Sequence, residues 1–175
     1  MTQKTRRYSS KTFNYKQDFA NTNFRENPEL YQVGRGEQGV LMVEPYKSEI
    51  LPFWRFRTPE IAEESGKKIY ELFLEYKSQN DFVGMDMARK FLQMGYTRSR
   101  RYANHKGGKK YKSNPQKETS AEAEKQSRKD QLPQELDALT NEKAQSARIF
   151  YGYYLKAKED PYYIKLKKEH QEKYG

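Results

Sequence analysis

The chain has 175 residues, about the length of one domain, with 34% hydrophobic residues, 33% charged residues and a net charge of +10. The absence of cysteine excludes disulfides and thiolate metal sites, and two histidines are too few for a histidine-based metal site. Carboxylates could still hold magnesium, but we expect no cofactor. No apolar run approaches the roughly 20 residues that span a bilayer, and no apolar segment suggests a signal peptide, so we expect a cytoplasmic protein.

Residues 1–30 are expected to form an irregular N-terminal arm, because their aromatic side chains lie among turn-forming residues. Beyond the arm, residues 31–33, 40–43 and 50–56 are short runs rich in β-branched and aromatic side chains. Turn-forming or charged residues bound each run. These runs predict the strands of a small antiparallel sheet.

The segment from Gly34 to Gly39, "GRGEQG", matches the dinucleotide-binding pattern G-x-G-x-x-G. That site needs a helix after the last glycine, but a β-type run and Pro45 follow here. A kinase-type loop would lie between strands, yet Leu41 replaces its valine and no kinase catalytic motif follows. We therefore interpret the segment as a hairpin loop whose glycines supply positive φ angles. The alternative is a loop that adds Arg35 and backbone amides to a ligand site.

Two helices are predicted in the middle of the chain. Thr58 and Pro59 are a suitable N-cap and first residue for an amphipathic helix that ends near Asn80. Asp81 then begins a second helix, and Gly95 is a suitable residue to end it.

The C-terminal part is predicted to be helical after a polar linker. Residues 113–132 form the linker, which lacks large apolar residues, and residues 133–175 supply a helical pair, the second helix beginning at Asp160. Residues 31–112 are expected to form the core. The predicted fold class is α+β, with a small antiparallel sheet packed by two central helices and a C-terminal helical pair outside.

No catalytic constellation is evident in the sequence. Glu44 and Lys47 lie three residues apart, whereas a strand-borne Glu-x-Lys nuclease pair needs a spacing of two. We interpret Asp81 as a helix N-cap and Asp86 as an i, i+4 partner of Lys90, rather than as metal ligands. We therefore expect no catalytic and no metal-binding residues, and the protein is more consistent with a non-enzyme.

The positive charge is confined to residues 89–112. This stretch holds nine basic and no acidic side chains, whereas residues 1–88 have no net charge and residues 113–175 carry +1. A focused excess of one sign attracts polyanions. A competing interpretation is a solvated connector whose arginines pair with glutamates of the preceding helix, namely Glu63, Glu64 and Glu75.

Basic side chains alternate with tyrosines in this stretch and surround a Gly-Gly pair. Arginine forks suit phosphate, tyrosine rings can stack on exposed bases, and a Gly-Gly turn lets the backbone approach an anion. The predicted phosphate-binding residues are Arg35, Arg98, Arg100, Arg101, His105, Lys106, Gly107, Gly108, Lys109 and Lys110. The predicted stacking residues are Tyr96, Tyr102 and Tyr111.

Three longer segments carry a family resemblance: "YQVGRGEQGVLMVEPYKSEILPFWRFRTPEIA", "DFVGMDMARKFLQMGYTRSRRYANHKGGKKY" and the closing "KLKKEHQEKYG". They resemble an uncharacterised family, a domain of unknown function found in cyanobacterial tailed phages, bacteria and fungi. The resemblance covers the chain from about Phe13 to Tyr111 and again near its end. It implies no activity and no catalytic residues. It implies an intracellular setting, the host cytoplasm if the protein is phage-encoded.

These observations favour a non-enzymatic accessory protein that binds nucleic acid through the basic stretch. The first alternative is an enzyme or binder for a nucleotide or another phosphorylated small molecule, with Arg35, His105 and the Gly107-Gly108 turn in one pocket. The second is a protein-interaction module for an acidic partner. No membrane contact is expected, and the oligomeric state does not follow from the sequence.

Overall fold

The computed structural model describes residues 13–175 and is all-helical over that range. The α-helices are α1 (Tyr46–Ile50), α2 (Pro59–Ser78), α3 (Phe82–Asn104), α4 (Ala121–Lys129), α5 (Glu142–Lys158) and α6 (Pro161–Tyr174). Four short 3₁₀ helices are η1 (Pro28–Leu30), η2 (Leu51–Phe53), η3 (Lys106–Gly108) and η4 (Pro115–Lys117). Within these residues there is no strand, only an isolated antiparallel bridge between Tyr111 and Gln131. The predicted α+β class is therefore wrong.

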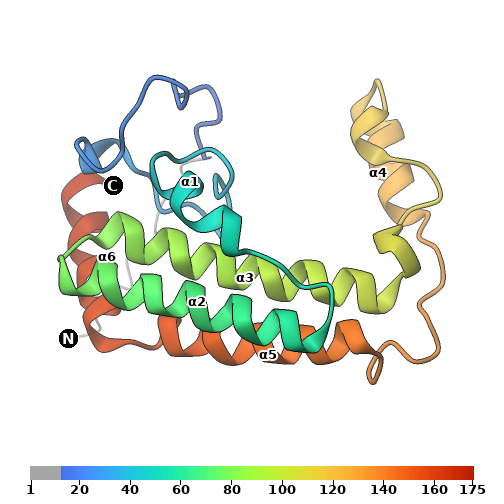
Figure 1. Ribbon diagram of the computed structural model, residues 1–175. Helices are drawn as coiled ribbons and strands as arrows, with labels where there is room; N and C mark the ends of the chain where they lie inside the picture. Colours follow the sequence, from blue (N-terminus) through green and yellow to red (C-terminus); the bar gives the residue numbers. More distant parts are fainter. Residues whose placement is uncertain (1–12) are drawn as a thin grey trace, which may run out of the picture.

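Helices α2, α3 and α5 form a three-helix bundle, and α6 crosses one end of it (Figure 1). The irregular segment that contains η1 and α1 lies over the same end of the bundle. The C-terminal helices were predicted to lie outside the core, but α5 is one of its three main elements. None of the helices within residues 13–175 combines the length and the apolar character that crossing a membrane would require.

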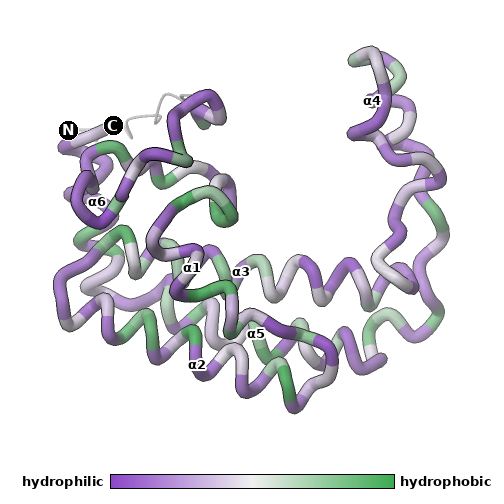
Figure 2. The backbone as a smooth tube through the Cα atoms, turned by 45° about the horizontal axis from the view of Figure 1, so that its top comes forward, coloured by the Kyte–Doolittle hydropathy of each residue, from purple (hydrophilic) through white to green (hydrophobic). Residues whose placement is uncertain are grey.

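Between α3 and α5 the chain forms an extension that stands apart from the bundle in Figure 1. We call residues 109–132, which include α4, the lateral arm. Its base is closed by two backbone hydrogen bonds, Lys112 N–H to Asp130 O at 3.0 Å and Leu132 N–H to Lys110 O at 2.8 Å. Figure 2 shows that the arm is mostly hydrophilic, whereas hydrophobic residues recur along the bundle helices.

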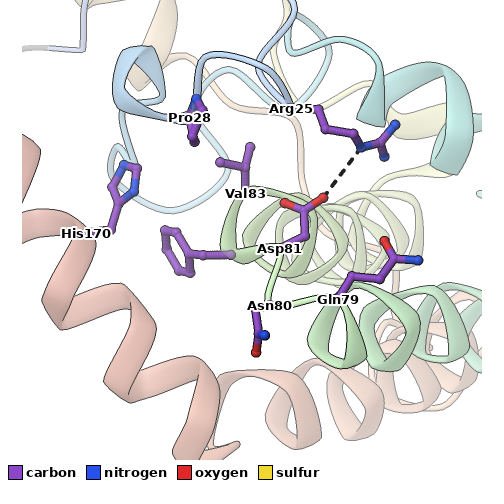
Figure 3. Close-up of a pocket in the computed structure, with 8 residues that line it drawn as sticks. Arg25, Pro28, Gln79, Asn80, Asp81, Val83 and His170 are labelled. Atoms are coloured by element: carbon purple, nitrogen blue, oxygen red, sulfur yellow. Dashed lines mark ion pairs between the residues drawn. The ribbon is translucent and has the colours of Figure 1, made fainter.

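The predicted starts of three helices are confirmed. Thr58 Oγ1 accepts a hydrogen bond from the Ile61 amide at 3.2 Å at the start of α2. Asp81, which Figure 3 shows at the start of α3, accepts one from the Gly84 amide at 3.0 Å. Asp160 caps α6 in the same way, through the amides that follow Pro161. Each cap satisfies a backbone donor that the helix itself cannot satisfy.

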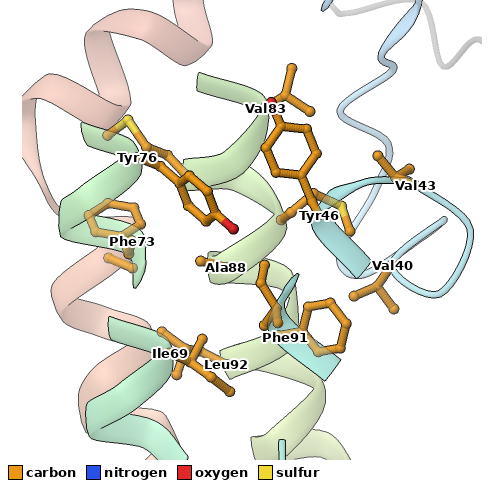
Figure 4. Close-up of a cluster of buried hydrophobic side chains, with 14 of the residues drawn as sticks. Val40, Val43, Tyr46, Ile69, Phe73, Tyr76, Val83, Ala88, Phe91 and Leu92 are labelled. Carbon is orange, nitrogen blue, oxygen red and sulfur yellow. The ribbon is translucent and has the colours of Figure 1, made fainter. Parts of the chain in front are cut away.

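The side chains that suggested strands are buried, but their backbone does not form a sheet. Val40 lies in a turn, Val43 follows it and Tyr46 begins α1; all three belong to the buried cluster that also contains residues of α3 (Figure 4). β-Branched and aromatic residues suit any half-buried surface, so their clustering does not specify a strand without a pairing partner. Here they serve as anchors that attach an irregular segment to the bundle.

Helix α3 does not end at Gly95, as predicted, but continues to Asn104. A Cβ atom at Gly95 would collide with the ring of Phe150 on α5. This glycine is therefore a close-packing position that lets two helices approach, and it is not a C-terminal signal. The missing side chain allows Phe150 to be fully buried in the bundle.

Candidate nucleic-acid interface

The predicted basic stretch occupies most of α3, the η3 turn and the base of the lateral arm. Its nine cations do not form one surface. Arg89 and Lys90 are buried near the start of α3, whereas the others lie in its last turns and beyond. The structure therefore divides the stretch into an internal pair and an outer group.

The internal pair surrounds Asp86, whose side chain is fully buried. Arg89 donates to Asp86 Oδ1 from Nη2 at 2.6 Å and from Nε at 3.1 Å. The Tyr163 hydroxyl donates to the same carboxylate at 2.6 Å, and the Tyr31 hydroxyl donates to its other oxygen. Lys90 Nζ lies 3.8 Å from Asp86, which confirms the predicted i, i+4 pair.

Burial and charge act together on the pKa values of this cluster. Desolvation alone would raise the pKa of Asp86, but Arg89, Lys90 and the two tyrosine hydroxyls lower it to about 2. Desolvation lowers the pKa of Lys90 to about 8, because the attraction of Asp86 offsets only part of the burial. At neutral pH the cluster holds one carboxylate and two cations, and neither cation is available to a ligand outside.

The glycine loop packs on this internal pair. Arg89 Nη1 donates to Gly36 O at 2.6 Å, and Lys90 Nζ donates to Gln38 O at 2.8 Å. The loop thus presents carbonyls to cations, the reverse of a phosphate-binding loop, which presents amides to an anion. Gly34, Gly36 and Gly39 have φ angles of 71°, 60° and 78°, as predicted for the glycines, but no hairpin strands flank them.

Arg35 lies in this glycine loop and is exposed. Its amide donates to the side chain of Gln38 at 2.7 Å. The next residue, Gly36, lies beside Gln93 in the middle of α3. Arg35 is therefore not brought together with the residues that follow the end of α3.

Several of the predicted site residues hold the protein together instead of facing solvent. Arg100 Nη2 donates to Asn104 Oδ1 at 2.6 Å and to Ala138 O at 3.0 Å, which ties α3 to the segment returning from the arm. Tyr102 packs edge-on against Phe56 with ring centroids 5.4 Å apart. The His105 ring is only 5% exposed.

Lys112 pairs with Asp130 at 3.4 Å, and five outer cations remain: Arg98, Arg101, Lys106, Lys109 and Lys110. None of them forms an ion pair within 4.0 Å to any carboxylate of residues 13–175. The connector interpretation required arginines of the stretch to pair with Glu63, Glu64 or Glu75, and none of these pairs occurs among residues 13–175. We call these five residues the outer basic group.

Four members of the outer basic group lie at the end of α3 and in the turn that follows it, whereas Arg98 lies nearly two turns earlier, near Glu37. Arg101 Nε donates to Gly108 O at 2.7 Å, and its guanidinium lies 5.8 Å from the ring centroid of Tyr111. Lys110 Nζ lies 5.4 Å from the same ring. Gly107 and Gly108 both have positive φ, 67° and 72°, which turns the chain sharply after α3 and allows Arg101 and Lys110 to lie beside the same ring.

A shallow cavity of about 360 Å³ lies at the opposite end, between η1 and the start of α3 (Figure 3). Arg25, Asp81 and His170 are among its lining residues, and Arg25 Nε lies 3.6 Å from Asp81. Asp81 also caps α3 and accepts the Tyr46 hydroxyl, so its oxygens are already used. Within the described residues no group of three or more His, Asp or Glu side chains is placed to hold a metal ion.

The pocket imagined for an enzyme is not assembled. Gly36, which follows Arg35, lies beside Gln93, whereas His105 and the Gly107-Gly108 turn follow the end of α3, about 18 Å farther along at 1.5 Å per residue. Sequence reasoning recognised the Asp86–Lys90 pair but did not recognise that Arg89 joins it inside the core. The available signal was the run "GMDMARKFLQM", in which three charges stand among large apolar residues.

Comparison with known proteins gives a family but no function. A family model described as a domain of unknown function, DUF4385, matches residues 14–173. No curated protein and no solved structure matches the chain.

Proposed function

Since the chain belongs to the DUF4385 family, whose function is unknown, we propose its function from its surface: it is a non-enzymatic accessory protein that binds nucleic acid through the outer basic group. The observation that carries this proposal is the absence of ion-pair partners for all five cations within residues 13–175. Other exposed cations of the same range, such as Lys16 and Lys67, are also unpaired, but these five lie within residues 98–110, a segment that contains no acidic side chain.

The position of the group also supports a polyanion ligand. Cations in the last turn of a helix are stabilised by the helix dipole, which explains Arg101 without any ligand. Lys106, Lys109 and Lys110 lie beyond the helix and gain little from it, because the effect fades within one turn. A cluster of unpaired cations attracts an anion with several charges, and phosphates along a strand provide this.

Tyr111 adds a ring between the cations. Two basic side chains flank it, and its backbone is fixed by the bridge to Gln131 at the base of the arm. A tyrosine held beside arginine and lysine can stack on a base whose phosphates those cations contact. We therefore include Tyr111 in the proposed interface and leave out Tyr102 and His105, which are engaged or buried.

The experiment is a binding titration with a matched charge control. The test variant replaces Arg101, Lys106, Lys109 and Lys110 by glutamine, and the control replaces Lys16, Lys67, Lys168 and Lys173, which are exposed on other parts of the molecule. Both variants lose four positive charges. Labelled single-stranded and duplex DNA and RNA are followed by fluorescence anisotropy at low salt.

The wild type and the control are expected to bind, and the test variant is expected to lose most of its affinity. Equal loss in the two variants would mean that net charge, not this surface, drives binding, and would overturn the proposal. So would a wild type that binds none of these probes. Binding to an acidic protein alone would favour the interaction-module alternative.

A further inference from the structure

A second surface, along the outer seam of α3, α5 and α6, combines rings with cations. Tyr151, Tyr154 and Lys158 lie on one side of α5, because their spacing of three and four residues returns to the same face of a helix. The ring of Tyr96 on α3 lies 5.0 Å from that of Tyr151, and Tyr151 lies 6.1 Å from Tyr154. With Lys167 of α6, these four residues make up what we call the tyrosine–lysine face.

The tyrosines of this face differ from those of the core. The hydroxyls of Tyr31 and Tyr163 bond to Asp86, as a buried tyrosine requires. The hydroxyls of the face tyrosines, Tyr96, Tyr151 and Tyr154, form no hydrogen bond with any of residues 13–175, and 43% of Tyr151 is exposed. Tyr151 is therefore accessible to a ligand, and Tyr96 and Tyr154 lie partly buried beside it.

The lysines of the face have no carboxylate partner. Lys158 Nζ lies 5.7 Å from the ring centroid of Tyr154, and no carboxylate of the described chain lies within 4.0 Å of Lys158 or Lys167. Lys167 follows Tyr163 by one turn of α6, and the Tyr163 hydroxyl contacts Arg89 at 3.1 Å. Lys167 therefore lies beside the buried Arg89.

The electrostatic balance around Lys167 is unfavourable without an anion. Burial lowers the pKa of Lys167 first, and the nearby charges of Arg89 and Lys158 lower it further, against some attraction from Asp86. Asp86 does not pair with Lys167, because its oxygens already accept hydrogen bonds from Arg89 and from the two tyrosine hydroxyls. Lys167 thus lies near Arg89 and Lys158 without a carboxylate partner of its own.

We infer that the tyrosine–lysine face binds single-stranded nucleic acid, with unpaired bases against Tyr151 and Tyr154 and phosphate near Lys158 and Lys167. The inference rests on the proposed function for the class of ligand, but it uses a different surface. Accessible rings favour a single strand over a duplex, because the bases of a duplex are stacked on one another and cannot reach a tyrosine. The five cations of the outer basic group contact phosphate, which single strands and duplexes both present, so that surface depends on stacking only through Tyr111.

The test compares two pairs of exposed tyrosines. The variant Tyr151→Leu, Tyr154→Leu keeps apolar volume and helix propensity but removes the rings. The control Tyr15→Leu, Tyr174→Leu removes rings that are also exposed but lie elsewhere. Both are titrated with labelled oligothymidine and with a duplex of equal length, and their thermal unfolding is compared with the wild type.

The face variant is expected to lose about tenfold or more in affinity for the single strand, at roughly 1–3 kcal/mol per stacked base, and to keep its affinity for the duplex. The control is expected to keep both. Replacing Lys158 and Lys167 by glutamine should also weaken binding of the single strand, whereas the same change at Lys165 and Lys168 should leave that binding unchanged.

The two proposals can fail separately. If removing the outer basic group weakens binding but the face variant binds both probes like the wild type, only this inference is overturned. If the face variant loses affinity for the single strand while the outer group variant binds both probes like the wild type, the interface proposed above is overturned and this one stands. Equal loss of the single strand and the duplex in the face variant overturns the inference, because it shows no stacking contribution.

Discussion

Replacing Asp86 by asparagine should destabilise the protein strongly. The carboxylate is fully buried and is the only one paired, within residues 13–175, with Arg89 and Lys90. Asparagine has nearly the same shape but no charge, so two buried cations would lose their counterion. Breaking a buried ion pair in this way costs about 3–5 kcal/mol, a large part of the roughly 5–15 kcal/mol that stabilises most domains. At about 2–4 °C per kcal/mol, the melting temperature should fall by roughly 6–20 °C.

The assay is denaturant unfolding at neutral pH, with thermal unfolding as a second readout. The matched control is Glu169→Gln, the same chemical change in an exposed pair with Lys165 at 3.9 Å, which should change stability by less than about 0.5 kcal/mol. A free energy of unfolding for Asp86→Asn that lies as close to the wild type as the control does would refute the reasoning, because the buried cations would then not need the carboxylate.

Three further predictions concern the stability of the protein. Lys90→Met should reduce a rise in stability above pH 8. The folded pKa of Lys90, about 8, lies below the unfolded value, so the unfolded chain binds more protons from there to about pH 10, and the wild type should gain more stability than the variant over that range. Gly39→Ala should destabilise by about 1–3 kcal/mol, since φ is +78° and a Cβ would lie 2.5 Å from Phe13. Gly152→Ala, in open space within α5, should stabilise by about 1 kcal/mol. Urea unfolding measures all three. The first is contradicted if the difference in unfolding free energy between the wild type and Lys90→Met does not change with pH. The others are contradicted if Gly39→Ala has the stability of the wild type or if Gly152→Ala is less stable than the wild type.

The helix starts could be predicted from the sequence because they depend on local chemistry. Thr58 with Pro59, and Asp160 with Pro161, satisfy backbone donors within a few residues of themselves, so no distant contact is needed to recognise them. The end of α3 depends on a distant contact. Gly95 resembles a helix terminus until Phe150, from another helix, fills the space beside it.

The predicted sheet was wrong for a similar reason. The runs that contain Val40 and Ile50 are apolar because they lie against the bundle, and the sequence does not distinguish burial against a helix from burial in a strand. A strand also needs a hydrogen-bonded partner, and periodicity within one segment does not reveal one.

The sequence shows that residues 89–112 are basic, but it does not show which of the cations are buried and which are exposed. Arg89 and Lys90 counted toward the net charge of the basic stretch, yet both face Asp86 and donate to carbonyls of the glycine loop. Their apolar neighbours were the sign that this part of the helix is internal. Arg100 gave no such sign, because the backbone carbonyl that it binds, at Ala138, lies in a segment with no pattern of its own.

The most direct test of the proposed interface is the salt dependence of nucleic-acid binding for the wild type and the variant that lacks Arg101, Lys106, Lys109 and Lys110. Each phosphate contact contributes about 0.7–0.9 to the slope of log affinity against log salt, so the four cations account for a slope of about −3 to −4. We predict that the slope of the variant is smaller in magnitude by that amount. An unchanged slope would contradict the account, because the nucleic acid would then be held by cations other than those left unpaired at the end of α3.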